Sequence, residues 1–222
     1  MITFFDFQLS QQLSGVNGVI FFAEKIFMMA GAEDPVMCTI IVGVVQSIAT
    51  LVSSVLVDRA GRKFLLILSG VGMAIFLVAL GYFFIILESK GDVTNLKWLP
   101  LVSVVGYIVV FSLGFGPLPW MMAGELLPPQ IKGFGSGITV AVNWTSVSVV
   151  TLFFQPLVKL ISSGYMFSMF AVISVIATLF IIFFVPETKG KSMQEIQDEL
   201  AGIKSSTTSV ETESSLFNDF EN

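Results

Sequence analysis

Long apolar stretches alternate with short polar breaks along most of the chain. A helix needs about 20 consecutive, mostly apolar residues to cross a bilayer. The sequence contains six segments of this kind, near residues 4–28, 36–57, 64–87, 99–124, 134–158 and 165–185. Each segment is predicted to be a transmembrane helix. The expected fold is therefore an all-α membrane protein in which residues 1–185 form one bundle of six transmembrane helices.

The pattern changes after Pro186. Within residues 186–204 the apolar positions recur at intervals of three and four, at Met193, Ile196, Leu200 and Ile203. This spacing predicts a short amphipathic helix on the cytoplasmic side of the membrane. Residues 205–222 are mostly Ser, Thr and acids, and they hold too little apolar area to offset the entropy of ordering. They are predicted to be a disordered acidic tail.

The distribution of Lys and Arg predicts the orientation. The breaks at 58–63, 125–133 and 186–204 carry seven bases, whereas the breaks on the opposite side carry four. Because short cytoplasmic loops are enriched in Lys and Arg, the first group is expected to face the cytoplasm. With six spans, both termini are then cytoplasmic.

The fourth apolar segment ends in an unusual stretch, GFGPLPWMMAGE at residues 114–125. Proline inside a helix removes a backbone hydrogen bond and clashes with the preceding turn, so Gly116, Pro117 and Pro119 predict a bend. Irregular backbone at membrane depth is tolerated where it is buried in protein or lines a watery cavity. A bend beside Trp120 therefore indicates a lined cavity or a moving part; the alternative is a kink that serves packing alone.

Three side-chain amides, Gln11, Gln12 and Asn17, lie within the first apolar segment. An unpaired polar group in hydrocarbon is costly, so these amides are expected to face protein or water. On a regular helix Gln12 and Asn17 would lie about 140° apart. Gly15 and Gly18 are expected to loosen the helix and bring the two amides together, as in the discontinuous helices of transporters.

Further polar and aromatic side chains lie inside other predicted spans, namely Gln46, Asn143 and Trp144. Amides both donate and accept hydrogen bonds, which suits a ligand rich in hydroxyls. Aromatic faces suit the apolar C–H faces of a sugar ring, and the candidates for this contact are Trp120, Trp144, Phe21 and Phe22. The alternative is that the amides hold helices together by hydrogen bonds between them.

Composition narrows the class of protein. Of the 222 residues, 55% are hydrophobic and 12% are charged, which indicates an integral membrane protein. With no His and a single Cys38, the sequence offers no catalytic triad, no His/Cys metal cluster and no sign of a cofactor. An enzyme is therefore not expected. The net charge of −5 resides in residues 186–222, and no basic patch for nucleic acid is seen.

Charged residues cluster at the predicted cytoplasmic ends of the spans: Asp58, Arg59, Arg62, Glu125, Lys132 and Glu187. Gly61 supplies a positive φ for the tight turn between the two arginines. Because Arg binds carboxylates through two hydrogen bonds, these residues can form a latch that breaks when helices move. The alternative is that they only anchor the orientation of the chain.

Taken together, the motifs resemble those of the sugar-porter branch of the major facilitator superfamily, especially facilitative hexose and insect trehalose transporters. The matching motifs are QQLSGVN at 11–17, DRAGRK at 58–63, GFGPLPWMMAGE at 114–125, NWT at 143–145 and PETKGKS at 186–192. The resemblance implies a fold of two six-helix bundles around a central site that opens alternately to each side. The chain matches the second bundle only.

The same resemblance implies roles for individual residues. It assigns sugar binding to Gln11, Gln12, Asn17, Gln46, Trp120, Asn143 and Trp144. It assigns gating to Phe21, Phe22, Gly116, Pro117 and Pro119, and a charge network that stabilises the outward-open state to the six cytoplasmic residues named above. Two positions depart from the family: Phe22 stands where Tyr is common, and Ser112 where mammalian glucose carriers have Glu.

Two functions follow as expectations. The first is facilitative transport of a hexose or trehalose across the plasma membrane, by a half-length chain that is inactive without an N-terminal six-helix bundle. Its partners would be the sugar, the lipid bilayer and that missing bundle. The second is a non-transporting membrane protein that associates with a full-length transporter or with a separate N-terminal half.

Overall fold

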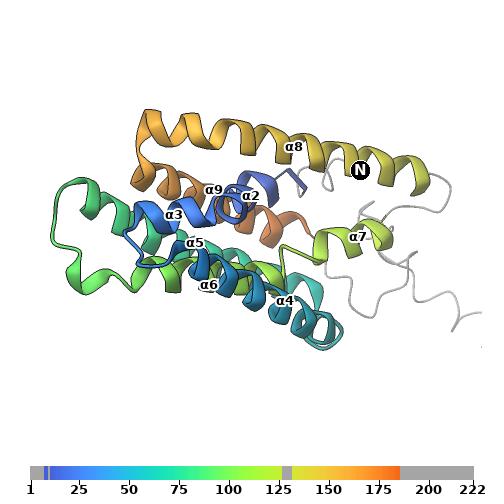
Figure 1. Cartoon of the computed structure of the whole chain (residues 1–222). Helices are drawn as coiled ribbons and strands as arrows, with labels where there is room; N and C mark the ends of the chain where they lie inside the picture. The colour runs from blue at the N-terminus through green and yellow to red at the C-terminus, as the bar shows by residue number, and fades with distance from the viewer. Residues whose placement is uncertain (1–7, 10, 127–131, 186–222) are drawn as a thin grey trace, which may run out of the picture. The chain divides into compact units, whose positions relative to one another are not determined.

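The computed structural model describes residues 8–9, 11–126 and 132–185, all within one compact unit that spans Met1–Lys189 (Figure 1). Of Asp58 and residues 123–126 only the backbone is described. The predicted amphipathic helix at 186–204 and the predicted acidic tail at 205–222 lie outside the described residues.

All regular structure in the described part of the chain is helical, as predicted. In chain order the elements are α2 (Val16–Phe21), α3 (Ala23–Met29), α4 (Pro35–Ala60), α5 (Arg62–Glu88), the 3₁₀ turn η1 (Thr94–Leu96), α6 (Leu99–Leu113), α7 (Leu118–Leu126), α8 (Lys132–Ile161) and α9 (Ser163–Phe184). Figure 1 shows the short α2 and α3 between α8 on one side and α6 on the other, in agreement with the contacts of α2 with α8 and of α3 with α6.

Five segments of the described residues are long and apolar enough to cross a membrane: Pro35–Val57, Arg62–Glu88, Thr94–Met122, Lys132–Ile161 and Ser163–Phe184. They match the second to sixth predicted spans. The first predicted span, 4–28, is not confirmed. Of its residues, 4–7 and 10 lie outside the described part, and the rest is interrupted at Gly15, where φ is 83°, and at Phe22.

The core is built around α5, which packs against both α6 and α9. Small residues permit this close approach, as is common between helices in membranes. A Cβ atom at Gly70 would lie 2.1 Å from Thr178 Oγ1, and one at Gly81 would lie 3.0 Å from the carbonyl oxygen of Gly164. The α5–α9 contact therefore depends on glycine at these positions.

We expect Gly70→Ala to destabilise the bundle, because Thr178 would have to turn away and lose the 2.7 Å hydrogen bond that its hydroxyl donates to the Ser174 carbonyl. Overpacking of this kind costs about 1–3 kcal/mol. Gly43→Ala is the matched control, since nothing lies within 4 Å of a Cβ at Gly43. Alanine there should be neutral or stabilise helix α4 by up to about 1 kcal/mol. Unfolding of both variants in mixed detergent micelles checks this; equal stability of the two would contradict it.

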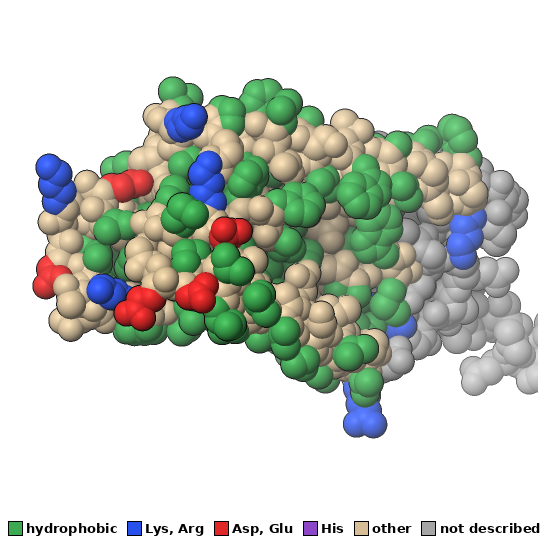
Figure 2. Space-filling view, in the orientation of Figure 1, with side chains coloured by type: hydrophobic (Ala, Val, Ile, Leu, Met, Phe, Trp, Pro, Cys, Tyr) green, Lys and Arg blue, Asp and Glu red, His purple; other side chains and the backbone are tan. Residues whose placement is uncertain are grey.

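Charged and apolar side chains separate clearly on the surface. Figure 2 shows most of the visible acidic and basic side chains at the end that carries the α5–α6 connection, whereas hydrophobic side chains dominate along the helices. Large apolar side chains are exposed on α4, α8 and α9, among them Leu51 (72%), Leu152 (70%) and Phe183 (75%). Of these helices, α4 and α8 also flank the pocket described next.

Candidate functional site

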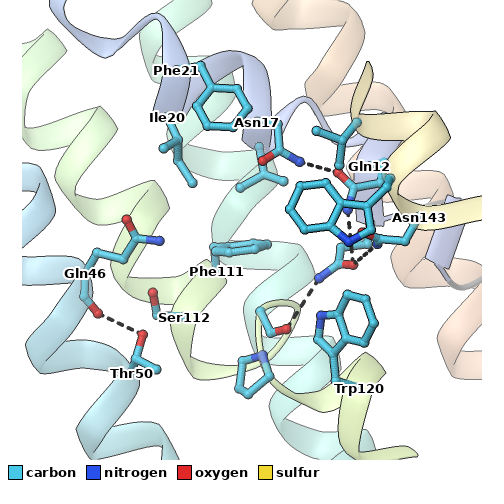
Figure 3. A pocket seen from close by; sticks show the side chains of 16 residues that line it. Gln12, Asn17, Ile20, Phe21, Gln46, Thr50, Phe111, Ser112, Trp120 and Asn143 are labelled. Atoms are coloured by element: carbon cyan, nitrogen blue, oxygen red, sulfur yellow. Dashed lines mark hydrogen bonds between the residues drawn. The ribbon is translucent and has the colours of Figure 1, made fainter. Parts of the chain in front are cut away.

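The described helical residues before α4, 8–9 and 11–29, are called the first stretch below. A pocket of about 400 Å³ lies where the first stretch, α4, the α6–α7 connection and α8 meet (Figure 3). All seven residues predicted to bind sugar line it: Gln11, Gln12, Asn17, Gln46, Trp120, Asn143 and Trp144. Of the predicted gating residues, Phe21, Gly116 and Pro117 line it as well. The structure thus brings together residues that lie up to 133 positions apart in the sequence, from Gln11 to Trp144.

The first helical stretch is broken at Gly15, which adopts the left-handed conformation with φ 83°. The carbonyl of Ser14 at this break accepts a hydrogen bond of 3.3 Å from the hydroxyl of the buried Tyr107 in α6. As a result of the break, Asn17 Nδ2 donates a hydrogen bond to Gln12 Oε1. The prediction that Gly15 brings these two amides together is therefore confirmed.

Gly18 does not interrupt the helix as predicted. It lies inside α2 rather than at an interruption, and a Cβ there would lie 2.2 Å from the ring of Phe154 in α8. Gly18 therefore allows α2 to approach α8 closely. The second interruption of the stretch falls at Phe22 instead.

The predicted bend in residues 114–125 is a break of four residues, 114–117, between α6 and α7. Each residue of an α-helix donates its N–H to the carbonyl four residues earlier, and proline has no N–H to donate. Pro117 and Pro119 therefore leave the carbonyls of Leu113 and Phe115 without a helical partner. Pro119 itself is the second residue of α7, in the first turn, where proline is well tolerated.

Side chains from other elements satisfy both of these carbonyls. Ser53 Oγ of α4 donates to the Leu113 carbonyl at 3.2 Å. Gln11 Nε2 donates to the Phe115 carbonyl and, at 3.4 Å, to the Gly116 carbonyl. The break between α6 and α7 is thereby bonded to the first stretch, and Gly116 and Pro117 of this break line the pocket.

Gln11 is the centre of a chain of amides. Its Oε1 accepts hydrogen bonds from Gln12 Nε2 at 3.4 Å and from Asn143 Nδ2 at 3.3 Å. Asn143 Nδ2 also donates to Gln8 Oε1 at 3.0 Å. These bonds connect the first stretch with α8, so the amides hold helices together as one of the two alternatives proposed; they also line the pocket, and their binding of a ligand stays a prediction.

Two indole rings border the pocket with exposed surface, Trp120 at 41% and Trp144 at 61%. Phe21 lines the pocket, but Phe22 does not belong to the lining. Phe22 stacks on Phe154 of α8, with ring centroids 4.8 Å apart and ring planes 7° apart. In this structure Phe22 therefore contributes to the packing of the first stretch against α8.

Sequence reasoning missed several contributors to the site. Gln8 is fully buried and accepts a hydrogen bond from Asn143. The criterion that identified the other amides, a polar side chain within a predicted span, would also have identified Gln8. Apolar and hydroxyl side chains complete the lining: Val16, Ile20, Thr50, Phe111, Ser112 and Val147. Their types are too common in membrane helices to stand out. Figure 3 shows Gln46 and Thr50 of α4 across the pocket from Asn143.

The predicted cytoplasmic charge network is described only in part. The side chains of Asp58 and Glu125 and the whole of Glu187 lie outside what the structure describes. Arg59 and Arg62 flank Gly61, whose φ of 94° agrees with the predicted positive value. Lys132 is exposed and begins α8. The latch between these charges remains a prediction.

Comparison with known proteins yields a consistent set of similarities. A family model described as sugar (and other) transporter matches residues 1–200. The chain is 46% and 49% identical, over 193 residues that make up 86% of it, to the facilitated trehalose transporters Tret1 of Culex quinquefasciatus and Polypedilum vanderplanki. It covers 37% and 38% of these two relatives.

Solved structures are similar as well. The proton:xylose symporter XylE of the major facilitator superfamily, bound to 6-bromo-6-deoxy-D-glucose, superposes with a TM-score of 0.76 at 30% sequence identity. The matched region covers 90% of this chain and 42% of the symporter. The chain therefore spans less than half the length of each of these proteins.

Proposed function

Because the chain belongs to the sugar (and other) transporter family, whose members are integral multi-pass membrane proteins and not enzymes, we propose that its pocket forms one wall of a sugar-binding cavity. The substrate is a hexose or trehalose, moved by facilitative transport. The observation that carries this proposal is the convergence of seven amide and indole residues from separate helices on a single pocket of about 400 Å³.

The chemistry of the lining supports a neutral, hydroxyl-rich ligand. Amides supply donors and acceptors without net charge, which matches sugar hydroxyls. Trp120 and Trp144 offer flat apolar faces with a polar N–H edge, suited to a ring that is apolar on its faces and polar at its rim. Among the described residues that line the pocket, none carries a charge, so this part of the lining offers no counterion to a charged ligand.

A second bundle completes the cavity in this proposal. The helices α4 and α8, which flank the pocket, expose more apolar surface than the core helix α5. Relatives of this chain are more than twice as long, so the additional bundle is expected to come from the part that this chain does not match. Transport then proceeds by alternating access, with the cytoplasmic charges setting the balance between states. The membrane is the plasma membrane, and both termini of the chain face the cytoplasm.

The exposed faces of α4 and α8 also fit the alternative function, association with a full-length transporter or a separate N-terminal half without transport by this chain itself. Both functions require a helical partner. They differ in whether sugar is bound and moved, which a binding measurement and an uptake measurement decide.

Tryptophan fluorescence offers a direct test of sugar binding, because only three tryptophans occur in the chain and two of them border the pocket. We expect trehalose or D-glucose to change the emission of the chain in lipid nanodiscs in a saturable manner. Indole contacts are worth about 0.5–1.5 kcal/mol, so Trp120→Phe should weaken the sugar affinity roughly two- to tenfold. Trp98→Phe is the matched control, because Trp98 lies at the start of α6 outside this pocket.

Two results would count against the proposal. The first is an emission change that disappears in Trp98→Phe but persists in the Trp120→Phe, Trp144→Phe double variant. The second is the absence of any saturable change with either sugar, up to concentrations at which the relatives transport.

A further inference from the structure

A second cavity, of about 410 Å³, lies where the end of α3 meets the beginnings of α4 and α6, and it is called the end pocket below. It shares no lining residue with the pocket described above. Its lining combines apolar side chains, among them Phe27, Met37 and Leu101, with the charged side chains Glu33, Asp34 and Lys97. The end pocket is therefore a separate site of different chemistry, and the proposed function makes no use of it.

The three charged side chains of the end pocket do not form ion pairs with one another. Within the described part of the chain, the Glu33 carboxylate and the Lys97 ammonium take part in no hydrogen bond or ion pair. One oxygen of Asp34 accepts a hydrogen bond of 2.9 Å from the backbone N–H of Met37 and caps α4. Two negative charges and one positive charge thus border the cavity. A ligand that carries both an ammonium and an anionic group would find a partner for each.

The indole of Trp98 supplies an aromatic wall of the end pocket. Its Nε1 donates a hydrogen bond of 3.0 Å to the Asn95 carbonyl, which uses the only polar group of the ring. Because 58% of Trp98 is exposed, the ring itself stays open to contact. An ammonium group is attracted to the face of an indole. Among the described residues no group of three or more His, Cys, Asp and Glu is placed to hold a metal ion. The lining therefore favours an organic ammonium over a metal ion.

The end pocket lies at the depth of the lipid headgroups. Trp98 comes directly before α6 and Asp34 directly before α4, and both helices belong to segments that are long and apolar enough to cross a membrane. Tryptophan is enriched where such segments meet water, at the level of the headgroups. Figure 2 shows charged side chains gathered at the end that carries the α5–α6 connection, to which Lys97 belongs. Ligands that combine an ammonium with an anion at this depth are zwitterionic phospholipids.

An apolar stripe leads from the end pocket along α4. Met37, Ile41 and Val44 follow one another at helical spacing, and all three are exposed. At about 100° per residue, this stripe lies about 140–180° around the helix from Gln46, which lines the other pocket. The stripe therefore lies on the side of α4 that is turned away from the other pocket. An acyl chain attached to a headgroup in the end pocket can follow it toward the middle of the bilayer, which a soluble zwitterion could not exploit.

We propose that the end pocket binds the headgroup of a zwitterionic phospholipid, with its ammonium between Glu33 and the face of Trp98 and its phosphate at Lys97. One acyl chain lies on the apolar stripe of α4. An anionic phospholipid without an ammonium would leave both carboxylates of the pocket without a partner. The bound lipid contacts the ends of α3, α4 and α6 at once and holds them together. This inference goes beyond the proposed function and does not depend on the binding of a sugar.

The single cysteine of the chain, Cys38, lines the end pocket and reports on its occupancy. We compare the rate at which N-ethylmaleimide, an uncharged reagent, alkylates Cys38 in nanodiscs of phosphatidylcholine, phosphatidylethanolamine or phosphatidylglycerol. The rate should be at least fivefold lower in the two zwitterionic lipids than in phosphatidylglycerol, because the bound headgroup shields the thiol. The negative surface of phosphatidylglycerol by itself attracts protons, lowers the thiolate fraction and slows alkylation, so it cannot produce this result.

A pair of matched variants shows whether the shielding depends on the proposed ammonium partner. In Glu33→Gln, the ratio of the rates in phosphatidylglycerol and phosphatidylcholine should fall below two. Glu24→Gln makes the same change of charge at an exposed position of α3 outside the end pocket, and it should keep the ratio of the unmodified chain. Equal rates in all three lipids, or equal ratios in the two variants, overturn the inference. Shielding by glycerophosphocholine in detergent without phospholipid would assign the pocket to a soluble ligand and also overturns it.

Discussion

Replacing Gly15 by alanine is expected to lower sugar affinity at least tenfold, because this residue holds the first stretch in its broken form. Gly15 has φ 83°, and a Cβ there would lie 2.6 Å from the ring of the buried Phe170. The left-handed conformation costs an L-residue about 1–2 kcal/mol, and the clash adds about 1–3 kcal/mol. If the stretch responds by straightening, Gln12 and Asn17 turn about 140° away from one another.

Gly31→Ala is the matched control for this substitution. Gly31 also has a positive φ, 75°, but nothing lies within 4 Å of a Cβ at that position, and it is outside the lining of the pocket. It shares the conformational cost and lacks the clash. Calorimetric titration with trehalose and D-glucose, together with unfolding in micelles, separates the two effects. Equal sugar affinity in Gly15→Ala and Gly31→Ala would contradict the assigned role of the break.

The sequence was informative where a residue type is unusual for its surroundings. Prolines and amides inside apolar segments are rare; the prolines correctly indicated the break between α6 and α7, and the amides are among the residues that line the pocket. The helical class and five of the spans followed from hydropathy alone. Membership of the family followed from motifs such as QQLSGVN and GFGPLPWMMAGE, which combine these unusual residues in order.

What the sequence did not reveal depends on contacts between distant segments. Nothing in the local pattern indicates that Gln11 bonds the backbone of residues 115 and 116, that Ser53 satisfies Leu113, or that Phe22 turns to Phe154. The same limit explains Gly18, which the sequence marks only as a small residue and which the fold uses for close packing against Phe154. The sequence likewise predicted loosening of the first span at Gly15 and Gly18, whereas the structure interrupts it at Gly15 and Phe22.

Transport is expected only when this chain is paired with a six-helix N-terminal bundle. The pocket in this chain is lined by the first stretch, α4, the α6–α7 connection and α8. A sugar bound there would be in contact with protein on one side only. Alternating access needs a second wall that moves against the first. The N-terminal half of the Culex quinquefasciatus relative is a suitable partner, because this chain covers 37% of that protein at 46% identity.

Two substitutions on α8 distinguish transport through this pocket from nonspecific leakage. Asn143→Leu removes an amide that lines the pocket and bonds Gln8 and Gln11. Leaving a buried hydrogen-bond partner unsatisfied costs about 1–3 kcal/mol. If this cost falls on the transporting form, uptake should decrease roughly 5- to 150-fold. Thr145→Val lies two positions further along the same helix and outside the pocket lining, and it should leave uptake unchanged.

The most direct test of transport through this pocket is uptake of radiolabelled trehalose and D-glucose by cells that express this chain alone or together with the N-terminal half of the Culex relative. We expect saturable uptake by the pair, loss of that uptake in Asn143→Leu but not in Thr145→Val, and background uptake by the chain alone. Saturable uptake by the chain alone, or uptake by the pair that Asn143→Leu leaves intact, would contradict the proposed role of the pocket.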